Sequence, residues 1–421
     1  MSLHPRQRHR PEPSWLTITL WDFSWVTRAG RGEPFADLDR AFRETVARGY
    51  NAVRVDAMPL LLFDDAGRPR DRLTMVPWPG RLGKGLRWYD QRQPATIRPA
   101  EHVRALFAGA KRHGVRVIAS SWEYQQTPTF LAERGLADEL AEIPPARRFE
   151  RLGRGMDHLL RFLSGHDLLD AVAYVELHNE VNASRLADAD AADPLAAMRQ
   201  PQEEALAALR GAHPGTRFTT CYTNLPPERP DVVPADVDVL HVHVYEFGPL
   251  RDLYRAVGVY DGAYPTEFAR SLWRADAPPY EEHVFGLGDR WREAATFVRR
   301  PMIHLHDACD PRAFDGWLRD RWPGQHEAVV ERIERKLRAY ADEARRRGVP
   351  AVVGEGWIGY TPLRSRFEAG PEGKEVVRRA LRRARELGYW GAVLCSNHAP
   401  HHPEWEEQTW RQLLTGAAAS A

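Results

Sequence analysis

Cysteine is scarce in this sequence of 421 residues, which contains only Cys221, Cys309 and Cys395. Their number is odd and their spacing is not that of metal ligands, so they indicate no zinc site. Cys221 and Cys395 lie in apolar runs, and we expect both to be buried as small hydrophobic side chains. Hydrophobic residues make up 43% of the chain, which is enough for a large core.

Long apolar runs and an excess of one charge are also lacking. No apolar run approaches the ~20 residues that a transmembrane helix needs, and the polar N-terminal segment, MSLHPRQRHRPEPSW, has no apolar centre like that of a secretory signal. The net charge is +1, from 59 basic and 58 acidic residues, which gives no indication of a nucleic-acid or membrane partner. We therefore expect a cytoplasmic protein that binds neither. The sequence does not indicate an oligomeric state.

Nucleotide-binding motifs are absent as well. No G-x-G-x-x-G follows the first predicted strand, and no G-x-x-x-x-G-K-[ST] is present. The sequence implies no metal and no organic cofactor.

Eight short apolar segments alternate with helical patterns along the chain. The predicted strands are residues 16–23, 51–57, 115–121, the start of 171–182, 218–222, 237–245, 350–355 and 390–396. The predicted helices are residues 37–48, 100–112, 147–162, 201–212, 325–347 and 374–387. This alternation is typical of parallel βα units. Eight such units favour an α/β fold with a single TIM (β/α)8 barrel, which we expect to cover residues 1–421 as one catalytic domain.

Two long stretches interrupt this alternation. Residues 58–97 form a connection rich in Pro, Gly, Trp and Arg, and its tryptophans, Trp78 and Trp88, argue against disorder. Residues 246–323 lie between the sixth and seventh predicted strands, and they are rich in aromatic residues and proline. Within them we predict helices near 265–273 and 290–299. We expect residues 246–323 to be an insertion that acts as a partial lid over the barrel mouth.

Two predicted strands end in carboxylates. The stretch AVAYVELHNEVN, residues 171–182, turns from apolar to polar and contains Glu180, and the stretch VPAVVGEGW, residues 349–357, contains Glu355. In a TIM barrel the active site lies at the C-terminal ends of the strands, so these two carboxylates would face each other across a substrate. Glycoside hydrolysis needs one protonated and one ionised carboxyl group in this arrangement.

Neighbouring residues distinguish the two glutamates. Arg54, within the second predicted strand, and Tyr245, at the end of the sixth, are expected to donate to Glu355, which favours its ionised form. Glu355 would then be the nucleophile. Glu180 would be the acid/base, because the negative charge of Glu355 would keep it protonated until Glu355 becomes glycosylated.

The sequence resembles the cellulase-like retaining glycoside hydrolases, a clan of TIM barrels that includes family 5. The matching residues, in family order across roughly residues 15–400, are Arg54 in NAVRV, Asn179–Glu180, His243-x-Tyr245 and Glu355. The resemblance implies a carbohydrate substrate, an oligosaccharide or a glycoside, whose O-glycosidic bond is cleaved by double displacement. It implies that Asn179 binds a sugar hydroxyl, that Arg54 and Tyr245 hold the nucleophile, and that His243 lines the site.

The sequence departs from the family pattern at two strand ends. A histidine common near the end of strand three is replaced by Ser121–Trp122–Glu123, and a sugar-stacking tryptophan after strand eight is replaced by Ser396–Asn397–His398. Trp357 or Trp122 would have to supply the sugar platform instead. Further candidates are placed only by their position at strand ends, and they are Trp21, Asp22, Glu123, Asn397 and His398.

Two alternative functions remain open. His241 and His243 share one face of the sixth strand and, with a carboxylate, could bind zinc in a metal-dependent hydrolase. The barrel could also be a non-catalytic sugar-binding protein, because a fold does not fix a function.

Overall fold

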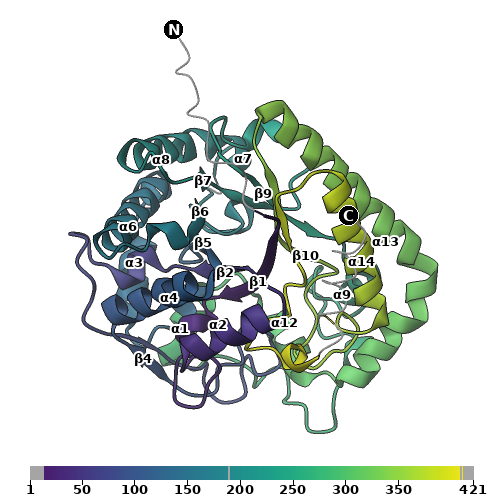
Figure 1. The fold of residues 1–421 in the computed structure, drawn as a ribbon. Helices are drawn as coiled ribbons and strands as arrows, with labels where there is room; N and C mark the ends of the chain where they lie inside the picture. Colours follow the sequence, from purple (N-terminus) through teal and green to yellow (C-terminus); the bar gives the residue numbers. More distant parts are fainter. Residues whose placement is uncertain (1–13, 188–189, 408–409, 411–421) are drawn as a thin grey trace.

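The computed structural model describes residues 14–187, 190–407 and 410, and it is a barrel of parallel strands surrounded by helices (Figure 1). The strands are β1 (Leu16–Asp22), β2 (Ala52–Asp56), β5 (Arg116–Ser120), β6 (Val172–Glu176), β7 (Phe218–Thr219), β8 (Cys221–Thr223), β9 (Leu240–Tyr245), β10 (Ala351–Trp357) and β11 (Gly391–Val393). They pair in the order β7-β6-β5-β2-β1-β11-β10-β9-β8. Only Thr220 separates β7 from β8, so these two form one strand position and the barrel closes with eight.

The predicted TIM barrel is therefore confirmed. Every residue of β1, β2, β6, β9 and β10 is buried, because the strands are covered on both faces. Strands buried on both faces have continuous apolar sequences, and this is why all eight predicted strand segments were visible in the sequence.

Amphipathic helices cover the outside of the barrel. The large ones are α2 (Leu38–Ala47), α4 (Pro99–His113), α6 (Pro145–Gly165), α8 (Arg199–Ala212), α13 (Pro311–Arg347) and α14 (Pro371–Glu386). Shorter helices are α1 (Ser24–Thr27), α5 (Arg134–Glu142) and α7 (Pro194–Ala197). The prediction that a helix begins at residue 325 is wrong, because α13 begins at Pro311 and continues through Pro323. A proline inside a helix removes one main-chain hydrogen bond, and the 37-residue helix contains it nevertheless.

Residues 58–97 are ordered by aromatic packing. They contain α3 (Pro59–Leu62) and the antiparallel pair β3 (Leu73–Met75) and β4 (Ala95–Ile97), which we did not predict. The ring of Trp78 is buried against Tyr89 and Phe285, with ring centroids 4.7 and 5.1 Å apart. Its Nε1 donates to Thr129 Oγ1 at 2.9 Å, which satisfies the buried indole.

Residues 246–323, called the 246–323 segment below, lie between β9 and β10. They contain α9 (Pro249–Ala256), α10 (Glu267–Ser271), α11 (Arg290–Ala294), α12 (Arg300–Ala308) and the start of α13. Helices were predicted near the places of α10 and α11, whereas α9 and α12 were missed. Hydrogen bonds attach the segment to the barrel loops: Arg292 donates to the Thr129 and Leu131 carbonyl oxygens at 2.7 and 2.8 Å.

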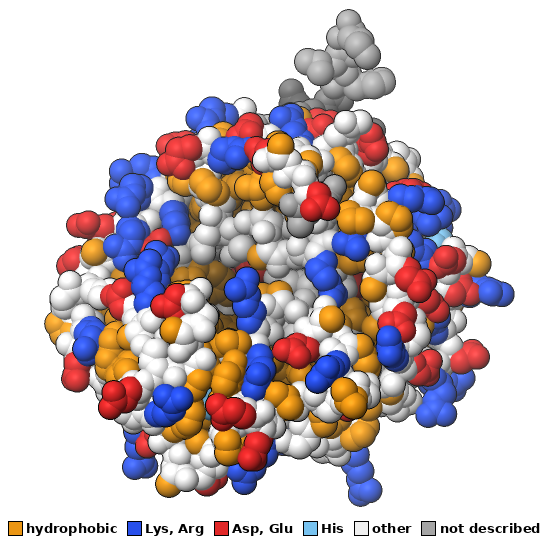
Figure 2. Space-filling view, turned by 180° about the vertical axis from the view of Figure 1, so that it is seen from behind, with side chains coloured by type: hydrophobic (Ala, Val, Ile, Leu, Met, Phe, Trp, Pro, Cys, Tyr) orange, Lys and Arg blue, Asp and Glu red, His pale blue; other side chains and the backbone are white. Residues whose placement is uncertain are grey.

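The surface carries charges of both signs. On the face seen in Figure 2, basic and acidic side chains are interspersed with apolar ones. Within the described ranges, we find no helix with the length and apolar character that spanning a bilayer requires.

Candidate active site

A cavity of about 330 Å³ lies at the C-terminal ends of the barrel strands, and both Glu180 and Glu355 line it. Glu355 belongs to β10, and Glu180 follows β6 at the start of a short turn, residues 181–183. The backbone of Glu180 is left-handed, with φ +41°, which is uncommon for a residue with a side chain and typical of functional sites. One oxygen of each carboxylate and a ring nitrogen of His243 all lie within 4.8 Å of one another.

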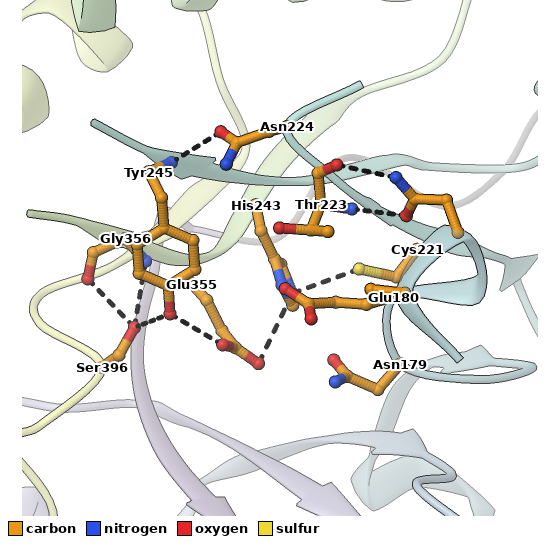
Figure 3. A network of polar contacts seen from close by, with 12 residues as sticks. Asn179, Glu180, Cys221, Thr223, Asn224, His243, Tyr245, Glu355, Gly356 and Ser396 are labelled. Atoms are coloured by element: carbon orange, nitrogen blue, oxygen red, sulfur yellow. Dashed lines mark hydrogen bonds and ion pairs between the residues drawn. The ribbon is translucent and has the colours of Figure 1, made fainter. Parts of the chain in front are cut away.

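Glu355 accepts hydrogen bonds from two side chains, of which Figure 3 shows that of Tyr245. Arg54 Nη1 donates to its Oε1 at 2.7 Å, and the Tyr245 hydroxyl donates to its Oε2 at 2.8 Å. These are the two donors expected from the sequence. Tyr245 is itself held at 2.9 Å from Ser396 Oγ, which accepts from the main-chain nitrogen of Gly356 at 3.0 Å. The strand ends of β9, β10 and β11 thus fix the orientation of Glu355.

Arg54 connects three polar groups in the barrel interior. Besides Glu355, its guanidinium donates twice to Glu176, at 2.6 and 3.1 Å, and once to Asn179 Oδ1 at 2.6 Å. The Arg54 side chain is fully buried, and it lies 4.5 Å over the ring of Trp122. A buried guanidinium needs such complete pairing, because an unpaired buried charge is very unfavourable. Glu355 is the partner of Arg54 that the sequence analysis expected, and Glu176 is a second one.

Glu180 has its own set of donors. His243 Nδ1 lies 2.9 Å from its Oε1, and Gln125 Nε2 donates to its Oε2 at 3.0 Å. His243 Nε2 lies 3.1 Å from Cys221 Sγ and 3.7 Å from Glu355 Oε1, so the imidazole is placed between the two glutamates (Figure 3).

The pKa values of the two carboxyls shift in opposite directions. Burial raises the pKa of Glu180, but the hydrogen bond and charge of His243, with smaller contributions from Thr223 and Gln125, outweigh it, so the pKa is lowered. Burial raises the pKa of Glu355, and the charge of Glu180 adds to this, so the pKa stays raised despite His243, Arg54 and Tyr245. In the free site these directions are the reverse of those expected from the sequence, because that expectation gave Glu180 no partner.

Three further predicted residues line the cavity. Asn179, Trp122 and Asp22 all have atoms on its surface. The Asn179 side chain is engaged at both ends, since its Oδ1 accepts from Arg54 and its Nδ2 donates to Gln125 Oε1 at 2.6 Å.

Trp21 and Trp357 do not line the cavity, which corrects the expectation that they contact substrate. Leu20 and Asp22 point to the cavity, so Trp21 between them faces the helices, where it packs on Phe35 and Phe42. Trp357 is 1% exposed, and its Nε1 donates to the Leu394 carbonyl oxygen.

Glu123, Asn397 and His398 are also outside the cavity, and each has a hydrogen-bond partner in another part of the chain. Glu123 accepts from the main-chain nitrogens of Leu60 and Leu61 at 2.6 and 3.0 Å. Burial and the charge of Asp56 raise the pKa of Glu123 to about 8. Asn397 donates to Glu368. His398 shares a hydrogen bond with the Tyr50 hydroxyl, and burial lowers its pKa to about 3.

Several residues that line the cavity were not identified from the sequence. They are mainly aromatic or apolar side chains of the loops, and they include Trp88, Phe247, Tyr254, Tyr260, Phe297, Met302 and Tyr360. The aromatic content of residues 58–97 and 246–323 was the available signal. Gln125 was missed because a single glutamine after a strand has no distinctive pattern.

The described residues contain three groups of side chains that are close enough to share a metal ion. They are Cys221 with His241 and His243, Asp22 with His401 and His402, and Glu180 with His243 and Glu355. The first includes the histidine pair that suggested a metal-dependent hydrolase. His241 is buried outside the cavity, with its Nδ1 2.8 Å from the Tyr174 hydroxyl and its Nε2 3.4 Å from Glu176, so it cannot hold a metal-bound water against a substrate there.

Known proteins resemble nearly the whole chain. The sequence model of a family described as sugar-binding cellulase-like matches residues 18–418. A crystal structure of a "putative glycoside hydrolase" from Parabacteroides distasonis aligns at 18% identity with a TM-score of 0.63, covering 96% of this chain and 93% of that chain. An endo-1,4-beta-D-mannanase from Thermotoga petrophila aligns at 11% identity with a TM-score of 0.48, covering 96% and 99%. No protein of curated function matches the sequence. At such low identity the first structure supports the fold alone.

Proposed function

Because the chain belongs to the sugar-binding cellulase-like family, we propose that it is a retaining glycoside hydrolase with Glu355 as nucleophile and Glu180 as acid/base. The fold is the cellulase-like glycoside hydrolase barrel, and the two glutamates stand at the C-terminal ends of its strands. The reaction is the hydrolysis of an O-glycosidic bond through a covalent glycosyl-enzyme.

The proposal rests mainly on the closeness of the two carboxylates. Oxygens of Glu180 and Glu355 approach within 4.8 Å on the wall of one cavity. Retaining enzymes hold their carboxyl groups about 5–5.5 Å apart so that one can attack the sugar directly, whereas inverting enzymes leave about 6.5–9.5 Å for a water molecule. The short approach favours direct attack.

The contacts of each glutamate support its role. Arg54 and Tyr245 fix both oxygens of Glu355, so one of them can be aimed at the anomeric carbon. Attack forms the bond from Glu355 to that carbon and breaks the bond to the leaving oxygen, which takes its proton from Glu180. Water then loses a proton to Glu180 and releases the sugar from Glu355.

Glu180 must therefore be protonated in the substrate complex, although its pKa is lowered in the free site. We propose that the bound sugar excludes water from the cavity, which disfavours the ionised carboxylate and raises its pKa. Protonated Glu180 can donate to His243 Nδ1 when the imidazole carries its proton on Nε2. His243 thus lets Glu180 change its protonation without losing a partner.

The dimensions of the cavity favour a small substrate. Its volume of about 330 Å³ is at the lower end of the range for ligand sites, about 300–1,000 Å³. Phe247, Tyr260, Phe297 and Met302 contribute a largely apolar wall from the 246–323 segment. We propose that this segment is a partial lid, and that the substrate is a short oligosaccharide or a glycoside.

The test is chemical rescue of Glu355→Ala. The variant should lose turnover on a responsive aryl glycoside, and azide should restore product formation as a glycosyl azide of inverted configuration at the anomeric carbon. Glu246→Gln is a matched control, because Glu246 pairs with Arg332 and Lys336 on α13 and does not line the cavity. If Glu355→Ala keeps near-full activity, the assignment is wrong.

A non-catalytic sugar-binding role is the second candidate, and the description of the family as sugar-binding favours it. Calorimetry that shows sugar binding, together with no hydrolysis across a panel of aryl glycosides, would support this role and contradict the first proposal.

A further inference from the structure

Asp22, His401 and His402 come together beside the active-site cavity. Asp22 is the last residue of β1, and the two histidines lie in the segment after β11. The three residues are 2%, 6% and 3% exposed. One ligand atom from each lies within 4.8 Å of the other two. Residues distant in the sequence thus bring one carboxylate and two imidazoles to one buried point.

Five polar side-chain atoms of this group have no hydrogen bonds to the described part of the chain. Asp22 Oδ2 and both ring nitrogens of His401 and His402 are buried without a partner. Most buried polar groups in proteins are satisfied, because leaving them unsatisfied costs the full loss of their hydration. One ring nitrogen of each histidine and one oxygen of Asp22 can share a ligand, so three of these five atoms indicate that something else occupies the space between them.

The geometry of the closest pair indicates a shared ligand. His401 Nε2 and Asp22 Oδ2 are 3.2 Å apart, yet their orientation does not make a hydrogen bond. Two atoms bound to one tetrahedral Zn²⁺ at about 2.0–2.1 Å lie about 3.3 Å from each other, and both then point at the ion and not at each other. We propose that Asp22, His401 and His402 bind a divalent transition-metal cation such as Zn²⁺.

The surroundings of the three residues are suited to this role. The other oxygen of Asp22 accepts from the Ser24 main-chain nitrogen at 2.5 Å, and the backbone of Asp22 is left-handed, with φ +45°. These features hold the carboxylate in one orientation, as hydrogen bonds to metal-binding carboxylates commonly do. The nearby Arg28 has its own acidic partners, Asp90 and Glu33, so its charge is compensated.

The donor set defines the class of cation. Two imidazoles and one carboxylate suit Zn²⁺, Co²⁺ or Ni²⁺ better than Ca²⁺ or Mg²⁺, which prefer oxygen ligands only. Three protein ligands leave a position for water or a substrate hydroxyl. Because Asp22 also lines the cavity of Glu180 and Glu355, the cation would fix the end of β1 at the edge of the substrate site.

The test is a titration of the chelator-treated full chain with Zn²⁺ alone, followed by calorimetry, with Co²⁺ absorption in the visible range as a second readout. We expect one equivalent of Zn²⁺ in the wild type, a tetrahedral Co²⁺ spectrum, and a raised melting temperature with Zn²⁺. His402→Ala should lose at least about tenfold in affinity, and Asp22→Asn should do the same while keeping the shape of the side chain.

Two controls separate this site from the alternatives. His166→Ala removes an exposed histidine, and Glu355→Gln changes another possible metal group, so both should still bind one equivalent. Binding that is lost in Glu355→Gln would place the cation at the catalytic pair and overturn the proposal. A wild type that binds no stoichiometric Zn²⁺, or a folded Asp22→Asn variant that binds it as the wild type does, would also overturn it.

Discussion

The floor and the wall of the cavity are built in different ways. The floor includes the strand-end side chains Tyr245 and Glu355, which are buried and hydrogen-bonded to each other, and Arg54 of β2 donates to Glu355 from the barrel interior. The wall includes Tyr260 and Phe297 of the 246–323 segment, which are 52% and 47% exposed. Charges on the floor depend on fixed partners, so changes there should alter stability and chemistry together. An exposed apolar side chain can change at little cost, so the wall should mainly set which substrates fit.

Arg54→Met should have the largest effect on stability. It leaves the fully buried Glu176 without its two guanidinium contacts and removes one donor from Glu355. We expect the free energy of unfolding to fall by about 3–5 kcal/mol, with a loss of turnover. Denaturant unfolding measures this. The matched control is Arg134→Met, since Arg134 is an exposed arginine on α5 paired with Asp138, and its stability should hardly change. If Arg54→Met is as stable as the wild type, stability does not depend on the paired charges of the floor, and the difference between floor and wall is contradicted.

Tyr245→Phe should mainly affect the chemical step. It removes the donor to Glu355 Oε2 and leaves Arg54 in place. We expect kcat to fall about 10- to 100-fold, equivalent to about 1.4–2.7 kcal/mol in the activation barrier. Steady-state kinetics on the best aryl glycoside would check this, and KM should change little. A variant with unchanged kcat would show that Tyr245 does not act on the nucleophile.

Glu123→Gln tests the place where the barrel meets residues 58–97. The pKa of Glu123 is raised to about 8 in the folded chain, against 4.5 ordinarily, so folding favours the protonated form. Its contribution to stability is full below about pH 4.5 and is lost as the pH rises toward 8. The amide cannot ionise, so the wild type should lose stability relative to Glu123→Gln across this window by several kcal/mol, because one unit of pKa shift is equivalent to about 1.4 kcal/mol. If the free energies of unfolding of the two proteins change with pH in the same way, the raised pKa of Glu123 is contradicted.

Phe297→Ala should have the smallest effect. Because the ring is about half exposed, the free energy of unfolding should change by less than ~1 kcal/mol. KM for glycosides with a large apolar leaving group should rise a few-fold, with kcat nearly constant. Kinetics on a pair of glycosides with small and large leaving groups would measure the difference. A fall in kcat alone would place Phe297 with the floor and not with the wall.

The same division explains what the sequence could predict. The barrel strands were visible because burial on both faces produces continuous apolar runs, as in β9 and β10. The start of α13 was missed because Pro323 looks like the end of a helix, and tertiary packing overrides that preference. Helices α9 and α12 were missed in the 246–323 segment, where no regular alternation marks them.

The site was predictable only as far as its strand positions. Glu180, Glu355 and Tyr245 line one cavity, with Arg54 hydrogen-bonded to Glu355, because strand ends converge in a barrel; their roles stay a prediction. Position at a strand end does not say which way a side chain points, so Trp21, Trp357, Asn397 and His398 were placed in the cavity wrongly. No sequence motif links His401 and His402 to Asp22, because the three residues become neighbours only when the barrel closes.

The central claim is that Glu355 becomes covalently glycosylated, and trapping that intermediate tests it most directly. A 2-deoxy-2-fluoro glycoside with a good leaving group, made from the sugar that the aryl glycoside panel selects, should add one fluoroglycosyl group to the intact protein. Peptide mass spectrometry should locate the added mass on Glu355. A label on Glu180, or hydrolysis that releases the inverted anomer without any label, would contradict the account.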